Sequence, residues 1–130
     1  MQERRWWATV AISGAVMVIL GAFAAHGLSG RLPLRLENAF FTGVRYQTWH
    51  TLAAMVLLVW RQHIRFFAQH LALMLWAGGV LLFSGSLYAM AIAELSGHSL
   101  GAFGIITPIG GLLLIAGWVT LAIGILCQGR

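Results

Sequence analysis

The chain has 130 residues, of which 60% are hydrophobic and only 8% are charged. Soluble domains carry roughly 25% charged residues, so this chain has too few of them to cover a surface that faces water. Its net charge of +5 comes from arginines that lie in short segments between long apolar runs rather than on one basic face, which argues against a nucleic-acid-binding protein. The composition therefore predicts a protein whose solvent is the lipid bilayer.

The first apolar run covers about residues 6–28, enough for a helix to cross the roughly 30 Å of hydrocarbon in a bilayer. Its basic start at Arg4 and Arg5 resembles a secretory signal peptide. However, the charge-free stretch from Trp6 to Gly30 is well beyond the apolar core of a signal peptide, which has about 7–15 residues. Since further apolar segments follow, we expect an uncleaved first span.

Residues 29–45 form the longest polar linker. Pro33 suits the first position of a helix. Apolar residues around and after it recur at helical spacing, namely Leu32, Leu36, Ala39, Phe40 and Val44. We therefore expect a short interfacial helix between spans one and two, with an ordinary solvated loop as the alternative.

Three more spans are predicted, at about residues 46–60, 66–93 and 103–127. Their apolar runs lack a period of two, so helices rather than β-strands are expected. The second is short for a span unless its helix begins earlier. The predicted fold class is an all-α, integral membrane four-helix bundle, with residues 1–130 as a single domain.

The arginines also predict the orientation. In a four-span chain both termini and the second linker share one side, which holds Arg4, Arg5, Arg61, Arg65 and Arg130. The opposite side holds Arg31, Arg35 and Arg45. Because cytoplasmic segments carry the excess of positive charge, we expect both termini in the cytoplasm.

Polar side chains gather at one depth of this topology. Every span contributes polar groups to the half near the outer surface, and the inner half is nearly bare of them. Gln47 and His50 are three residues apart and share a helix face, and buried polar groups in lipid must find partners. We therefore expect that face to turn inward and form a binding site. Its candidate residues are His26, Arg45, Tyr46, Gln47, His50, Ser84, Ser86, Tyr88 and Thr107.

Each candidate also has a purely structural interpretation. Tyr46 and Tyr88 fit an aromatic belt at the membrane interface, and Arg45 fits a side chain that extends to lipid headgroups. The histidines fit hydrogen-bonded packing, and the serines fit hydrogen bonds to their own helix. The shared depth, rather than any single residue, favours a site.

A metal centre or an active site is not indicated. His26 and His50 could meet across the first hairpin, but a third ligand is hard to find, and zinc sites need three or four. The three carboxylates are scattered, and the sequence has no phosphate-binding glycine loop, nucleophile elbow or C-x-x-C motif. We expect no metal and no cofactor, and the pattern disfavours an enzyme without deciding the question.

Four motifs are spread over most of the chain, from residue 21 to residue 118: GAFAAHGL (21–28), TGVRYQTWHTLA (42–53), LLFSGSLYAMA (81–91) and ITPIGGLLLIAGW (106–118). Together they resemble the YgdD-like family, also called domain of unknown function 423, a family of small bacterial inner-membrane proteins. One departure is Ala24, where the family pattern leads us to expect glycine. The resemblance implies a four-helix, multi-pass protein of the bacterial inner membrane and points to the same polar residues, without supplying an activity.

Our hypothesis is a binding or interaction module whose polar site in the outer half of the bundle holds a lipid, a quinone-like molecule or a partner membrane protein. Arg45 would then face an anionic headgroup or a negative charge on the ligand. The alternative is a small transporter or channel, which would have to be oligomeric because four short spans enclose little. The nearly apolar inner halves argue against a continuous polar path in a monomer. The sequence leaves open the identity of the ligand and whether the chain forms a homo-oligomer.

Overall fold

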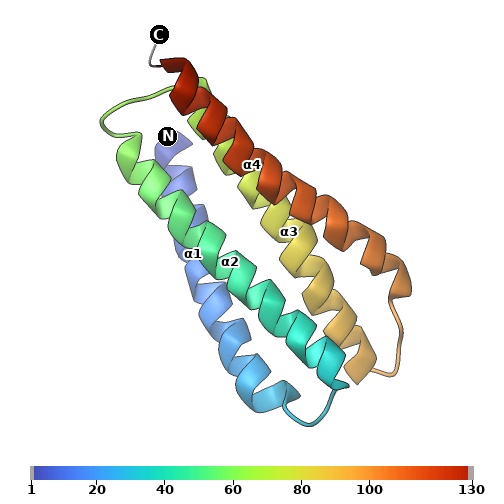
Figure 1. Cartoon of the computed structure of the whole chain (residues 1–130). Helices are drawn as coiled ribbons and strands as arrows, with labels where there is room; N and C mark the ends of the chain where they lie inside the picture. Colours follow the sequence, from blue (N-terminus) through green and yellow to red (C-terminus); the bar gives the residue numbers. More distant parts are fainter. Residues whose placement is uncertain (1, 129–130) are drawn as a thin grey trace.

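A computed structural model describes residues 2–128 and is all-helical apart from its connections. The long helices are α1 (Gln2–Phe23), α2 (Leu34–Trp60), α3 (Phe67–Leu95) and α4 (Ile106–Gln128). A π-helical segment, η1 (Ala24–Leu28), continues α1, and a 3₁₀ segment, η2 (Gly101–Ile105), precedes α4. Neighbouring helices run antiparallel, so both described ends of the chain and the linker 61–66 lie at one end of the bundle, which we call the terminal end (Figure 1).

Three stretches of helix are long and apolar enough to cross a membrane: Glu3–Leu28, Phe67–Leu95 and Gly101–Gln128. α2 is similarly long, at 27 residues, or about 40 Å at 1.5 Å per residue, but it carries more polar side chains. The predicted all-α class and helical membrane bundle are confirmed.

The short interfacial helix predicted before the second span is not a separate element. α2 begins at Leu34, directly after Pro33, and continues without a break to Trp60. The apolar stripe assigned to an interfacial helix instead packs inside the bundle, where Leu36 and Phe40 join one buried cluster with Leu28 of η1. The apolar face of this segment, at Leu36 and Phe40, therefore packs on protein as the first part of a long helix, which corrects the prediction of a separate interfacial helix. The other face, with Leu34, Arg35 and Asn38, is exposed.

The helices pack in chain order: α1 against α2, α2 against α3, and α3 against α4. Over the described residues the backbones of α1 and α3 do not come into contact with each other, although both contact α2. A gap therefore separates α1 from α3, and α2 lies along one side of it. Among the described side chains of α1, residues 3–23, only Val10 is buried, and more than half of the others are exposed.

The contact between α3 and α4 is much closer and depends on glycines. Gly110 lies against the backbone of Leu82 and Phe83, and Gly117 lies against the indole of Trp76. Small residues let helix backbones approach in lipid, where van der Waals packing rather than the hydrophobic effect drives association. α3 and α4 are therefore more closely packed on each other than α1 is on α2 or α2 on α3.

We predict that Gly110→Ala destabilises the bundle, because the new methyl group would meet backbone atoms of α3, among them Leu82 C and Phe83 Cα at 2.8 Å. Overpacking of this kind costs about 2 kcal/mol of unfolding free energy. The control is Gly111→Ala, whose methyl group would lie 3.6 Å from the ring of Phe83, an ordinary contact. Unfolding in mixed micelles measures both, and equal stability of the two variants would contradict the close contact.

Candidate functional site

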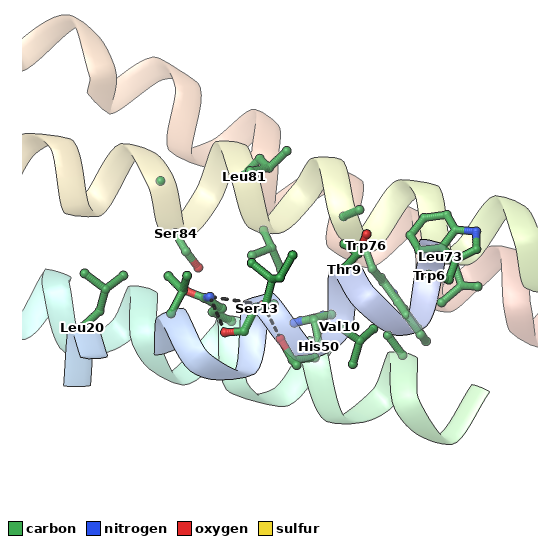
Figure 2. A pocket seen from close by; sticks show the side chains of 18 of the residues that line it. Trp6, Thr9, Val10, Ser13, Leu20, His50, Leu73, Trp76, Leu81 and Ser84 are labelled. Atoms are coloured by element: carbon green, nitrogen blue, oxygen red, sulfur yellow. Dashed lines mark hydrogen bonds between the residues drawn. The ribbon is translucent and has the colours of Figure 1, made fainter. Parts of the chain in front are cut away.

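A groove of about 370 Å³ lies between α1 and α3, with α2 as its floor. Figure 2 shows side chains from both helices spread along it, Trp6, Val10, Ser13 and Leu20 from α1, and Leu73, Trp76, Leu81 and Ser84 from α3. Two of its wall residues, Ile12 and Leu81, are 65% and 74% exposed. The groove is therefore open sideways, and in a membrane its opening faces lipid.

Gln47 connects three helices beneath this groove. Its Nε2 donates to the backbone oxygen of Ser13 at 3.1 Å and to Ser13 Oγ at 3.2 Å, and its Oε1 accepts a hydrogen bond from Tyr88 Oη at 2.8 Å. Ser13 Oγ also shares a hydrogen bond of 2.7 Å with Thr51 Oγ1. One buried amide thus links α1, α2 and α3, and each of its polar atoms has a partner.

Ser84 makes a second link between α2 and α3. The residue is 1% exposed, and its hydroxyl donates a hydrogen bond to the backbone oxygen of Gly43 at 2.7 Å. A side chain at Gly43 would collide with the ring of Tyr88, which lies 2.8 Å from the place of a Cβ atom. Glycine at this position lets Tyr88 approach α2 and place its hydroxyl on Gln47.

His50 lies about one turn further along α2 and contacts both Trp76 and Trp118, whose own rings pack on each other with centroids 4.5 Å apart. Its Nδ1 donates to the backbone oxygen of Tyr46 at 2.8 Å, because a carbonyl can only accept. Its Nε2 lies 3.1 Å from Trp118 Nε1 and must accept from that indole N–H. Both ring nitrogens are thereby used, which fixes the neutral imidazole with its proton on Nδ1.

The structure places the sequence-predicted residues in three groups. Gln47, Ser84 and Tyr88 belong to the network under the groove, and His50 lines the groove beside it. Ser86 and Thr107 share a hydrogen bond of 2.6 Å between α3 and α4, away from the groove lining. Tyr46 packs on the ring of Phe83 at 4.7 Å between centroids.

His26 and Arg45 are exposed and contribute no hydrogen bond to these groups in the described structure. The predicted inward face of Gln47 and His50 is present, but the predicted set does not form one cluster. Gln47 also lies midway between the ends of α2, because that helix begins earlier than expected. The network reaches the middle of the bundle.

Sequence reasoning missed Ser13, Trp76 and Trp118. A lone hydroxyl in an apolar helix usually bonds to its own backbone, so Ser13 gave little signal, although intramembrane polar residues are functional candidates by default. The two tryptophans lie among the apolar residues of the predicted spans 66–93 and 103–127 and gave no separate signal, yet Trp76 is 2% exposed and both lie against His50. Within the described part of the chain, no three His, Cys, Asp or Glu side chains gather in a way that could hold a metal ion.

Comparison with known proteins shows the family of this chain. The family described as "Protein of unknown function (DUF423)" matches residues 20–111. The chain belongs to this family. The match confirms the resemblance noted from the four motifs, and no solved structure matches the chain.

Relatives within DUF423 share most of their length with this chain. A Haemophilus influenzae protein named UPF0382 membrane protein is 41% identical over 122 residues, which cover 94% of each chain. The Escherichia coli UPF0382 inner membrane protein YgdD is 42% identical over 117 residues, 88% of this chain and 83% of the relative. The Bacillus subtilis UPF0382 membrane protein YwdK is 35% identical over 121 residues, 87% of this chain and 89% of the relative. These names place the family in membranes and assign it no activity.

We predict that Gln47→Leu lowers the unfolding free energy by about 1–2 kcal/mol, because it removes the link from α2 to Ser13 and leaves the Tyr88 hydroxyl without its partner. Thr48→Val is the matched control, since Thr48 bonds only to the Val44 carbonyl of its own helix. Its effect should stay below about 0.5 kcal/mol. If the two variants unfold alike in a denaturant titration, the network does not hold α1 in place.

Proposed function

We propose that this DUF423 protein is a membrane-embedded binding module, and that its α1–α3 groove holds the hydrocarbon chain of a lipid-like amphiphile. The observation that supports this most directly is the contrast between the walls and the floor of the groove. Apolar side chains make up most of the walls, which are open to lipid, whereas the polar side chains at the base of the groove already donate to protein partners, as those of Gln47, Ser84 and Tyr88 do. Because these polar groups already have partners, a ligand does not need to form hydrogen bonds with them, and a hydrocarbon chain is suited to the groove.

The size of the groove supports a chain-like ligand. Small-molecule sites are typically clefts of about 300–1,000 Å³ lined mainly by apolar groups, and a groove of about 370 Å³ lies near the lower limit. A helix of a partner protein is about 10 Å across and about 5.4 Å long per turn, so two turns of it would already occupy more than the 370 Å³ of the groove. A lipid is therefore our first choice, with a quinone-like molecule as a variant of the same class.

The packed interior of the bundle argues against a transport function. Toward the terminal end the space between α2, α3 and α4 is filled by a buried apolar cluster that includes Leu58, Leu73 and Trp76. Ion or solute conduction needs a path lined by polar groups, and this cluster interrupts one within a single chain. The groove opens to the side of the bundle instead.

We further propose that α2 also crosses the bilayer, giving four spans with both termini in the cytoplasm of a bacterial cell and the bundle in its inner membrane. α2 lies between α1 and α3 and matches them in length. Four described arginines lie at the terminal end, namely Arg4, Arg5, Arg61 and Arg65, and two lie at the opposite end, Arg31 and Arg35. Arg45, which the sequence prediction counted with these two, lies two residues before the middle of α2 and near neither end. Arg130, counted in the sequence prediction, lies outside the described residues. This excess favours a cytoplasmic terminal end.

Cysteine labelling tests the topology, because Cys127 is the single cysteine of the chain and is exposed. In a Cys127→Ser background, a membrane-impermeant maleimide should modify Ser29→Cys in intact spheroplasts and Gln62→Cys only after lysis. Both positions are exposed and flank α2. Equal labelling of the two would mean that α2 does not cross, and the reverse pattern would invert the orientation.

Filling the groove tests the binding proposal. Gly85 lines the groove and has no atom within 4 Å of the place of its Cβ, so Gly85→Phe should put a ring into empty space. Gly14→Phe is the control, because Gly14 has equally open surroundings on α1 but does not line the groove. In native mass spectrometry after gentle extraction, the wild type and Gly14→Phe should retain a lipid-sized mass that Gly85→Phe loses.

Retention by both variants would place the bound molecule elsewhere. A wild type that never carries such a mass, and that added lipid does not stabilise against heat, would overturn the binding function. Flux measurements in liposomes would then be the next experiment, since they address the transport alternative.

A further inference from the structure

We infer that the groove selects an anionic lipid from the leaflet at the terminal end of the bundle, with the headgroup at Arg5. The inference rests on the proposed binding function and adds a ligand class, an entry point and a specificity residue to it.

The groove continues beyond the network toward the terminal end. A second cavity, of about 410 Å³, is lined by Arg5, Trp6, Thr9, His70, Met74 and Ala77. Trp6, Thr9 and Ala77 line the first cavity as well. The two cavities are therefore neighbouring parts of one passage along the α1–α3 gap, from the membrane interface to the middle of the bundle.

Charge distinguishes the mouth of this passage from the rest. No acidic residue lines either cavity. Glu3, the nearest carboxylate along α1, is engaged by Arg61 at 3.1 Å and lies 4.0 Å from Arg65. Among the described residues Arg5 has neither a salt bridge nor a side-chain hydrogen bond, so its positive charge is available at the mouth. An anionic headgroup complements it.

The opposite end of the groove offers no equivalent entrance. Beyond Leu20 and Tyr88 the space between the helices is filled by the buried cluster that contains Ala24, Phe40 and Ala91. The arginines of that end do not line the groove. A headgroup can therefore enter at Arg5 and its chain must run inward from there.

The dimensions suit one lipid chain. From Arg5 to Ser13 is eight residues of helix, or about 12 Å, and from His70 to Tyr88 the passage extends about 27 Å along α3. One leaflet contributes about 15 Å of hydrocarbon. A headgroup at Arg5 thus leaves its chain beside Met74 and Ala77 and brings the chain end near the network. Trp6, at the rim, is a residue type that favours the membrane interface.

Lipid titrations in native mass spectrometry test the inference. The probes are phosphatidylglycerol and phosphatidylcholine with identical acyl chains, added to delipidated full-length protein. We expect the wild type to bind the first phosphatidylglycerol about fivefold more tightly, the effect of one arginine near a membrane surface. Arg5→Gln should reduce the ratio to about one while its affinity for phosphatidylcholine stays unchanged. Arg5→Lys should retain the preference.

Arg4→Gln is the matched control, because Arg4 is exposed, carries the same charge and does not line the passage. Arg4→Gln should keep the wild-type ratio. An equal loss of preference in both glutamine variants would indicate diffuse surface charge and overturn the inference, as would equal affinities of the wild type for the two lipids. Binding of neither lipid would instead overturn the proposed binding function itself.

Discussion

The bundle depends on the rule that a polar group inside hydrocarbon needs a protein partner. Gln47 satisfies this rule toward two neighbouring helices at once, through Ser13 of α1 and Tyr88 of α3. α1 buries little apolar surface in its central part, so directional bonds at the network and the ion pair of Glu3 with Arg61 fix where it stands. A helix held by such bonds can lie beside α2 without closing onto α3, and the groove is the space that this arrangement leaves.

The two sides of α3 illustrate opposite uses of small residues. Toward α4, Gly110 and Gly117 bring backbones and rings into direct contact and leave no space. Toward α1, Gly85 has nothing within 4 Å of its missing side chain, and the small residue widens the gap instead. Glycine therefore permits close helix contact on one side of α3 and leaves open space on the other, according to whether a neighbouring helix lies close.

Much of the fold could be predicted from the sequence, because apolar runs of span length admit few structures other than helices in lipid. The start of α2 could not, since Leu36 and Phe40 have the same spacing in an interfacial helix as in a longer buried one, and only their packing on Leu28 decides. The sequence prediction of the candidate site depended on the depth at which polar residues lie in the predicted membrane topology. Depth brings together Gln47, Ser84 and Tyr88, which line the groove, and their role in binding stays a prediction. Depth does not tell which way a side chain points, so the predicted set also includes His26 and Arg45, which are exposed. The role of Ser13 could not be predicted, because its partners Gln47 and Thr51 belong to another helix.

The sideways opening of the groove has a consequence for how a ligand would arrive. A site that faces the bilayer plane exchanges its occupant by two-dimensional diffusion, without transfer through water and without a loop that must lift. Occupancy then follows the mole fraction of the ligand among the surrounding lipids, rather than any concentration in the cytoplasm. Exposed wall residues such as Ile12 and Leu81 would contact the surrounding lipids in a membrane, so such a protein would respond directly to changes in the composition of that membrane.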